Sequence, residues 1–333
     1  MRRMPAEWEH QSAILLAMPH EKSDWYPYLR EARENFAAVI NEIIKRQKCL
    51  LLVDEWELYR EMFPQNERLI PIQMPTNDTW ARDFAPLGIE EEGKKYLLDF
   101  GFNGWGLKFP AFLDNQVSRN LDKKGIFRVP LRSKNFILEG GSIESNGAGI
   151  VLTNTQCLLE ANRNPEYSQE EIEMTLKREL GAQKVLWCHH GYLAGDDTNS
   201  HIDTLARFIG ENQIAYIKCD NEKDEHFSEL AAMEQELKAM RNLQGEPFEL
   251  FALPFSEAIY HNGERLPASY ANFLFINGAV LLPVYGDKND QKALEVMRRT
   301  LPSHEIIPID CRVLIRQHGS LHCISMQFFD GAV

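Results

Sequence analysis

The chain has 333 residues, of which 44% are hydrophobic and 26% are charged, so it can bury a sizeable core as a soluble globular protein. Its formal net charge of −13 disfavours binding to nucleic acid or anionic membranes, because both need basic surfaces. The same charge suits a cationic substrate, since a negative field attracts cations, although solubility is the simpler explanation.

The sequence favours a cytoplasmic location. Residues 1–10 have no apolar stretch of the kind found in secretory signals, and no apolar run is long enough to span a membrane. The six cysteines are widely scattered and none forms a C-x-x-C pair. We therefore expect reduced thiols, as is usual in the cytoplasm.

One pattern recurs about five times along the chain: a β-hairpin, an amphipathic helix and a short apolar strand. Apolar residues spaced three and four apart predict each helix, and Ser168 opens one of them as a capping box with Glu171. The first predicted helix begins near Pro27, and the second lies around 113–121 and ends at Gly125. The third covers 168–180 and the fourth covers 227–240. The fifth follows Asp287 and ends before Pro302.

A short β-like run follows each helix, at residues 49–53, 126–131, 184–188, 248–253 and 305–309. Asn-Gly turns predict hairpins at 143–147 and 275–279, and further hairpins are predicted over 87–98 and 205–218. Residues 13–18 form a strand without its own hairpin. The final strand, 321–329, could pair with it and close a ring.

These units predict a single α/β domain, residues 1–333, built as a closed radial array. The loop at 101–106 is rich in glycine and aromatic residues. We interpret it as an ordered loop that lines a cleft, with a purely structural loop as the alternative.

Chemically capable residues recur just before the hairpins. In chain order they are Trp80 to Asp83, Glu139-Gly140-Gly141, His201 with Asp203, Asn272, and Cys323. Equivalent positions of a radial array face its central axis, so these residues are expected to converge on one pocket.

Each member has a simpler interpretation when taken alone. Asp83 could form a surface ion pair with Arg82, and Cys323, expected on a short strand at 317–324, could be a small core residue. His201 and Asp203 alternate on what is predicted to be an extended segment, which would direct both side chains to one side.

Together the residues favour chemistry on a guanidinium group. Paired carboxylates match the N–H donors of this planar cation. A thiolate can attack its central carbon, and a histidine can protonate the leaving ammonia and then activate water. A carboxylate beside the imidazole would raise its pKa and orient it.

The motifs Trp80-Ala81-Arg82-Asp83, Glu139-Gly140-Gly141, His201-Ile202-Asp203 and 319–323, together with residues 5–10, resemble the agmatine deiminases. These belong to the guanidine-modifying pentein superfamily, as do the bacterial peptidylarginine deiminases. The resemblance implies a five-bladed α/β propeller of ββαβ units with pseudo-fivefold symmetry. It also implies hydrolysis of agmatine to N-carbamoylputrescine and ammonia, in putrescine and polyamine biosynthesis, without a metal or organic cofactor. A homo-oligomer, such as a dimer, is expected.

The resemblance further implies a role for each motif residue. Cys323 would be the nucleophile that forms a thiouronium adduct, and His201 would be the general acid and base. Glu139 would orient His201 and touch the guanidinium. Asp83 and Asp203 would grip the guanidinium, and Trp80 would form a wall of the pocket.

The substrate tail is less well defined. Members of the family often have glycine before the histidine, where this chain has Ser200, and the glycine run before Cys323 is short. Asp197 is predicted to pair with the far ammonium of agmatine, with a loop cap as the alternative. Asn272 is a further predicted substrate-binding residue, although bonding to backbone would also explain it.

Other functions remain open at this point. A deiminase of free or peptidyl arginine would use the same chemistry, and transfer of the amidino group to an amine would use the same adduct. A non-catalytic pentein that binds a partner would lack the cysteine, histidine and acids. Cys188-His189-His190 lacks the spaced partners of a zinc site, and Cys157 is predicted to be a core residue.

Overall fold

The computed structural model describes residues 2–333, and it contains all five helices predicted from apolar spacing. The best-defined ends belong to α6, where Ser168 and Glu171 form the expected capping box and Gly181 adopts φ 72°. The five helices are α1 (Leu29–Ile44), α4 (Val117–Lys123), α6 (Gln169–Leu180), α7 (Phe227–Ala239) and α8 (Asp290–Thr300).

Five sheets share one order of pairing, in which an antiparallel pair is extended by a parallel third strand. A parallel neighbour needs a long crossover, and one of the five helices lies within each crossover. The strand triplets are β5 (Leu87–Glu91), β6 (Lys94–Gly101) and β7 (Leu131–Ile137); β8 (Ile143–Ser145), β9 (Ile150–Asn154) and β10 (Lys184–Cys188); β11 (Ala206–Gly210), β12 (Gln213–Lys218) and β13 (Glu249–Pro254); β16 (Leu274–Ile276), β17 (Ala279–Val284) and β18 (Glu305–Asp310); and β19 (Met326–Phe329), β2 (Gln11–Ala17) and β3 (Lys48–Val53).

Short elements complete the sheets and connect them. β1 (Arg2–Arg3) extends the sheet of β5, β4 (Leu69–Gln73) extends that of β3, and β14 (Tyr260–His261) pairs with β15 (Glu264–Arg265). The short helices are α2 (Ala81–Phe84), α3 (Gly104–Leu107) and α5 (Thr155–Leu158), and the 3-10 turns near the site are η5 (Gly140–Ser142), η6 (Ile202–Thr204) and η7 (Leu314–Gln317).

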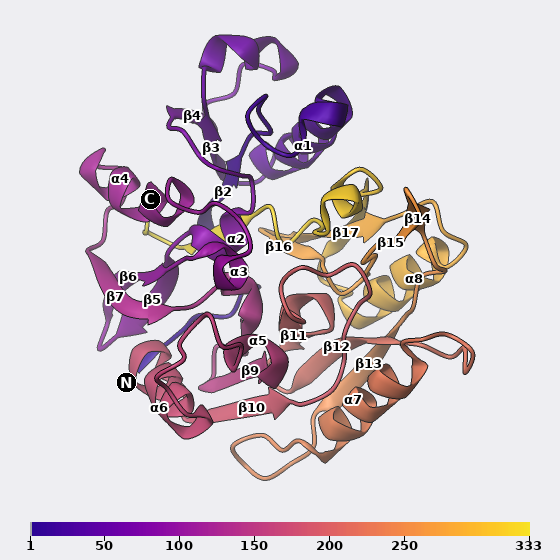
Figure 1. Ribbon diagram of the computed structural model, residues 1–333. Helices are drawn as coiled ribbons and strands as arrows, with labels where there is room; N and C mark the ends of the chain where they lie inside the picture. The colour runs from indigo at the N-terminus through magenta and orange to yellow at the C-terminus, as the bar shows by residue number, and fades with distance from the viewer. Residues whose placement is uncertain (1) are drawn as a thin grey trace.

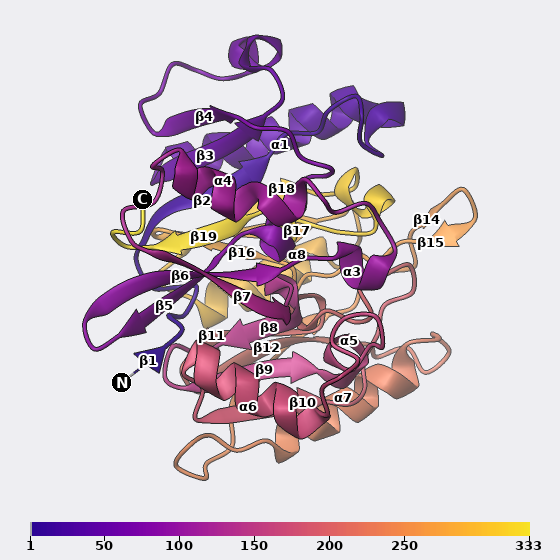
Figure 2. The ribbon, with the colours of Figure 1, turned by 60° about the vertical axis from the view of Figure 1, so that its left-hand side comes forward.

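The five sheets surround a common centre, with α1, α6, α7 and α8 on the outside and α2 and α3 near the middle (Figure 1). The turned view shows β19 beside β2 (Figure 2). The predicted closure of the ring is confirmed, because β19 pairs antiparallel with β2 and sets Phe328 opposite Ala13. The two ends of the chain are thereby joined in one sheet.

Three local predictions were wrong. Residues 126–130 are irregular and β7 begins only at Leu131, because the backbone N–H of Arg128 bonds to Ala332 rather than to a neighbouring strand. The final strand begins at Met326, not at 321, so Cys323 lies in a turn. The backbone N–H and hydroxyl of Ser325 both bond to the carbonyl of His322, which stabilises that turn.

The third wrong prediction is the extended segment at His201. Residues 202–204 form the 3-10 turn η6, in which the N–H and hydroxyl of Thr204 both donate to the carbonyl of His201. His201 and Asp203 therefore approach the site from a turn, and not by alternation along a strand.

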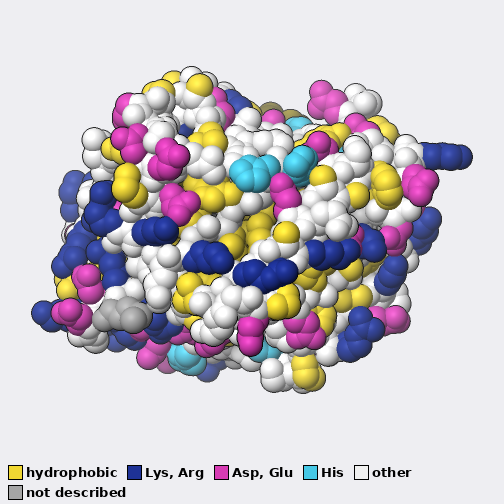
Figure 3. Space-filling view, turned by 90° about the horizontal axis from the view of Figure 1, so that it is seen from below, with side chains coloured by type: hydrophobic (Ala, Val, Ile, Leu, Met, Phe, Trp, Pro, Cys, Tyr) yellow, Lys and Arg dark blue, Asp and Glu magenta, His cyan; other side chains and the backbone are white. Residues whose placement is uncertain are grey.

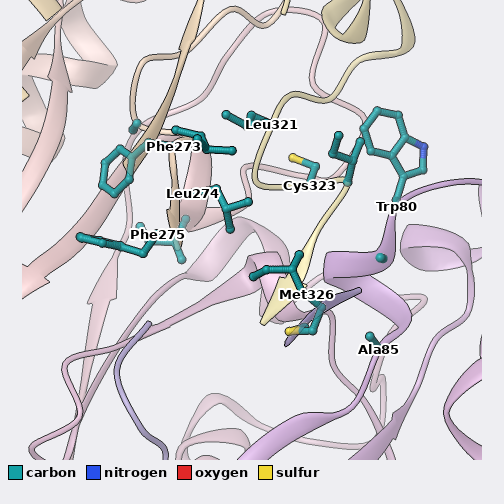
Figure 4. Packing of buried hydrophobic residues seen from close by; sticks show 14 of the residues in the cluster. Trp80, Ala85, Phe273, Leu274, Phe275, Leu321, Cys323 and Met326 are labelled. Atoms are coloured by element: carbon teal, nitrogen blue, oxygen red, sulfur yellow. The ribbon is translucent and has the colours of Figure 1, made fainter. Parts of the chain in front are cut away.

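The apolar core reaches the centre of the ring. Figure 4 shows Cys323 among buried apolar residues that include Leu321, Met326 and Trp80. The face seen from below in Figure 3 carries side chains of both charges. Within residues 2–333, no helix has the length and apolar character needed to cross a bilayer.

Candidate active site

A cavity of about 160 Å³ opens at the centre of the ring. Four of the predicted site residues form part of its wall: Trp80, Asp83, Asp197 and Cys323. Its full lining is Asp24, Asp78, Trp80, Asp83, Trp105, Phe109, Asp196, Asp197, Thr198, Thr204, Gln317, His318, Gly319 and Cys323. His201, Asp203, Glu139 and Asn272 lie behind this wall and are buried.

Gly141 is the point at which three of the predicted residues meet. Its N–H donates to Asp83 Oδ1 over 3.0 Å. A Cβ added to Gly141 would lie 2.6 Å from His201 Nδ1 and 3.0 Å from carboxylate oxygens of Asp83 and Asp203. The absence of a side chain at Gly141 therefore lets these groups converge.

His201 lies between two carboxylates. Its Nδ1 is 3.7 Å from Asp83 Oδ1, and its Nε2 is 3.4 Å from Glu139 Oε2. Burial alone would lower the pKa of His201, but the Asp83 carboxylate, Cys157 and the hydrogen bond that His201 donates to Glu139 outweigh it and raise this pKa well above its usual value. The imidazole is therefore protonated at neutral pH and can act as an acid.

Glu139 is fully buried and is held by an arginine that the sequence analysis missed. Arg163 Nε lies 3.0 and 2.8 Å from the two carboxylate oxygens of Glu139. Burial would raise the pKa of Glu139, but Arg163 and His201 lower it below the usual value. Arg163 itself donates to the carbonyl of Thr198 (2.7 Å) and to Asn199 Oδ1 (3.1 Å). Glu139 thus contacts His201 and Arg163 and is separated from the cavity.

Cys323 is held by Asn272. Asn272 Oδ1 accepts hydrogen bonds from the backbone N–H groups of His322 (2.9 Å) and Cys323 (3.4 Å), and Sγ of Cys323 is also 3.4 Å away. The amide of Asn272 donates to the carbonyl of Asp203. These contacts favour the alternative that Asn272 bonds to the backbone of the site, and substrate binding by Asn272 stays a prediction.

The thiol of Cys323 is neutral in the free protein. Burial raises its pKa well above the usual value, and the nearby carboxylates of Asp203 and Asp83 raise it further. A cation that bound to these carboxylates would remove this effect and favour the thiolate.

Two tryptophans contribute to the cavity wall. Trp80 donates to Asp78 Oδ2 (3.1 Å), and Gly319 packs so closely that an added Cβ would lie 2.2 Å from the Trp80 ring. Trp105 Nε1 donates to Asp83 Oδ2 over 2.9 Å. The expectation that the loop at 101–106 lines a cleft is therefore confirmed by Trp105.

Two clusters within the described residues have the side chains of a metal site. Their ligand atoms lie within 4.8 Å of one another, in the groups Glu139, Cys157, His201 and Glu7, Glu144, His322. An arginine already pairs with the acids of each cluster, Arg163 in the first and Arg207 in the second. A metal ion would therefore have to bind beside a guanidinium, so a metal fits neither cluster well. Cys157 is buried, as predicted, but it lies 3.7 Å from Glu139 rather than in a purely apolar core.

The sequence alone did not reveal several groups. Arg163 and Asp24 lie far apart in the chain from the motif residues that they approach. The others offered a signal by their position, because Glu7 lies within the motif at 5–10, Asp78 lies two residues before Trp80, Asp196 precedes Asp197, and His322 precedes Cys323.

Comparisons with known proteins agree with this geometry. A family model described as Porphyromonas-type peptidyl-arginine deiminase matches residues 3–328. An agmatine deiminase of Medicago truncatula is 30% identical over 358 residues, which cover 97% of this chain and 95% of the relative. A structure of C. jejuni agmatine deiminase, a cysteine-to-serine variant with substrate bound, is 42% identical with a TM-score of 0.95, covering 100% of this chain and 98% of that one.

A more distant structure shares the fold. It is a dimethylarginine dimethylaminohydrolase adduct with S-methyl-L-thiocitrulline, which is 12% identical with a TM-score of 0.51 and covers 96% of this chain and 100% of that one. This distant likeness shows the fold alone, and the agmatine deiminase relatives place the mixed α/β fold in the pentein superfamily.

Replacing Trp105 by Phe tests the hydrogen bond to Asp83. The ring would still line the cavity, but Asp83 would lose a donor, which is worth roughly 0.5–1.5 kcal/mol. We expect the affinity for methylguanidine, measured by calorimetry, to fall about three- to tenfold.

Trp187→Phe is the matched control, because it removes a similar 3.0 Å hydrogen bond to Glu173 on α6. This control should bind methylguanidine as the unaltered protein does. Equal affinity of the Trp105→Phe protein would show that the bond to Asp83 does not support the site.

Proposed function

The chain belongs to the family described as Porphyromonas-type peptidyl-arginine deiminase, has agmatine deiminases among its relatives, and is a member of the pentein superfamily; we propose that it hydrolyses agmatine to N-carbamoylputrescine and ammonia. The observation that carries this proposal is the composition of the cavity. Cys323 shares the wall with Asp24, Asp78, Asp83, Asp196 and Asp197, and no lysine or arginine is among the described lining residues. A substrate with a cation at both ends suits these walls.

The guanidinium head binds between Asp83 and Asp203. Asp83 lines the cavity, and Asp203 Oδ1 is a buried oxygen that has no hydrogen-bond partner within residues 2–333. Such an orphan acceptor is costly unless a ligand satisfies it. Trp80 provides a flat wall for the planar head.

The first half of the reaction forms the covalent adduct. Binding of the guanidinium neutralises the carboxylates around Cys323, so the thiol loses its proton to solvent. The thiolate attacks the guanidinium carbon and forms an S–C bond. Protonated His201 gives its proton to the leaving nitrogen, the C–N bond breaks, and ammonia departs from a thiouronium adduct.

The second half releases the product. Neutral His201 takes a proton from water as the oxygen attacks the adduct carbon. The S–C bond then breaks, the thiolate leaves, and the product loses the hydroxyl proton to become the neutral ureido group. Glu139 supports both halves by orienting His201, rather than by touching the guanidinium, because both of its oxygens contact Arg163.

The walls also suggest which group binds the substrate tail. Asp78 accepts hydrogen bonds from Trp25 and Trp80, and Asp196 accepts them from Thr198 and Ser200. Asp197 Oδ2, by contrast, lies 3.9 Å from the imidazole of His318. We propose that Asp197 pairs with the far ammonium of agmatine. Arginine would bring a carboxylate toward these acids and would be repelled.

Several broader features belong to the same proposal. We infer a single catalytic domain over residues 1–333 and a five-bladed α/β propeller with pseudo-fivefold symmetry, which the repeated antiparallel-then-parallel pairing supports. We further propose a cytoplasmic, homo-oligomeric enzyme of polyamine biosynthesis. Arginine deimination and amidino transfer are the alternatives within the chemistry.

Turnover is the direct test. The reduced protein should release ammonia and a ureido product from agmatine, with kcat/KM at least about a hundredfold higher than for arginine, because the arginine carboxylate meets acidic walls. The Cys323→Ala protein should show no turnover. If the folded, reduced protein does not turn over agmatine, the proposed function is wrong. If the Cys323→Ala protein retains turnover, the proposed mechanism is wrong.

The tail contact can be tested separately. Asp197→Asn removes one charge, so we expect KM for agmatine to rise about tenfold or more with a smaller change in kcat. The same substitution should leave the affinity for methylguanidine unchanged, because this ligand has no tail.

The matched control is Asp122→Asn, an exposed acid on α4 that keeps the net charge of the variants equal. It should behave as the unaltered protein. If Asp197→Asn leaves KM for agmatine unchanged, another acid of the wall binds the ammonium.

A further inference from the structure

His322, the residue before Cys323, joins two buried carboxylates. Its Nδ1 lies 2.7 Å from Asp203 Oδ2, and its Nε2 lies 2.7 Å from Glu7 Oε2. All three side chains are buried, with Glu7, His322 and Asp203 at 7%, 1% and 0% exposure. The bridge connects the N-terminal segment, the turn that carries Cys323, and η6.

The hydrogen-bond requirements of this bridge determine the state of the imidazole. Burial would raise the pKa of both carboxyls, but Arg207 and His322 lower that of Glu7, and His322 with His201 lowers that of Asp203. Ionised carboxylates accept hydrogen bonds and cannot donate them. To donate to both carboxylates at once, the ring of His322 needs a hydrogen on each nitrogen.

This arrangement leaves one oxygen of Asp203 free for substrate. Oδ2 is occupied by His322, and the backbone carbonyl of Asp203 accepts from Asn272. Oδ1 is buried and unpartnered within the described residues. The bridge thus fixes the carboxylate by one oxygen and leaves the other to accept a guanidinium N–H.

Glu7 is itself held from several sides. Its Oε2 accepts from Arg207 over 2.5 Å, and its Oε1 accepts from the backbone N–H of Phe275 over 2.8 Å. Arg207 in turn donates to Glu144 over 2.6 Å. The N-terminal segment is therefore part of the support of the active site, which gives the motif at 5–10 a physical role.

We propose that His322 is a positioning residue that, stabilised as a cation by Glu7, keeps Asp203 ionised and its Oδ1 available to the guanidinium. This inference rests on the proposed function, because it concerns the carboxylate that would grip the substrate. His322 does not contact the reacting atoms and acts through Asp203.

The pH dependence of kcat/KM involves every charged group around the bridge that Glu7, His322 and Asp203 form. Those that face Asp203 are His322, His201, Asp83, Arg82, Arg207 and Cys323, and His322 faces Glu7 and Glu144 in addition. Burial raises the pKa of Asp83, whereas the pKa of Asp203 is lowered. In the unaltered protein we therefore expect Asp83, and not Asp203, to be the carboxyl that contributes to the acidic limb of kcat/KM.

Two substitutions separate the two ends of the bridge. In His322→Gln the side-chain nitrogen can replace Nε2 and reach Glu7, but Asp203 loses its partner. In His322→Asn the nitrogen can replace Nδ1, so Asp203 keeps a neutral donor. Both lose the positive charge, so the pKa of Asp203 rises in both, and more in His322→Gln.

The expected result for His322→Gln is an acidic limb that moves to higher pH by about one unit and steepens by one proton, since Asp203 now titrates with Asp83. KM for agmatine should rise about tenfold or more, with a smaller fall in kcat. The acidic limb and the KM of the His322→Asn protein should lie between those of the His322→Gln protein and the unaltered protein. His261→Gln, which alters an exposed histidine on β14, is the control and should match the unaltered protein.

A purely structural role for His322 would lower activity at every pH and leave the limb in place. An unmoved limb in a His322→Gln protein with native circular dichroism would therefore overturn the proposal.

A measurement on the unaltered protein covers the case in which the variants do not fold. Nitrogen-15 spectra of labelled histidine at neutral pH should show hydrogens on both ring nitrogens of His322, and a ring with one bare nitrogen would overturn the proposal. This measurement needs no turnover. Failure of the unaltered protein to act on agmatine would count against the proposed function and leave the spectrum as a separate result.

Discussion

Buried carboxylates crowd around Cys323, and each of them needs a positive partner, because an ionised group is stable out of water only when it is paired. Arg163 pairs with Glu139, Arg207 with Glu7 and Glu144, and histidines lie beside Asp83 and Asp203. One acceptor, Asp203 Oδ1, has no partner in the described chain. The centre is therefore arranged for one more cation, which the substrate would bring.

The fold supplies these pairs from distant parts of the sequence. Glu7 precedes the first strand of the ring and His322 precedes the last, and β19 joins β2 to bring the two segments into one sheet. Asp83 and His201 arrive on short turns that meet at Gly141. Because the site spans the closure of the ring, formation of the site and completion of the fold depend on one another.

Much of the fold and part of the site could be predicted from the sequence, because some of their features depend only on neighbouring residues. The capping box at Ser168 and the apolar stripe of α6 depend on neighbours within one helix, so their prediction was accurate. The convergence of the motif residues followed from the repeated unit. The segments at His201 and Cys323 were predicted to be extended. They form turns instead, because hydrogen bonds from Thr204 and Ser325 stabilise a turn at each place.

Other parts of the site could not be predicted, because their cause lies in distant contacts. Nothing in the residues around Arg163 indicates that it pairs with Glu139, and Asn272 was assigned to substrate although it holds the backbone at Cys323. The substrate-binding roles of Asp83 and Asp203 remain predictions, now with a geometry that accounts for them.

The proposed mechanism depends above all on one bond, which Cys323 forms to the guanidinium carbon of agmatine. The most direct test is mass spectrometry of protein quenched in acid during turnover, followed by proteolysis. We expect the peptide containing Cys323 to carry the amidine of agmatine after loss of ammonia. The His201→Asn protein, which lacks the acid and base, should not accumulate this adduct. An adduct on Cys157 instead, or turnover with no adduct at any quench time, would contradict the proposed mechanism.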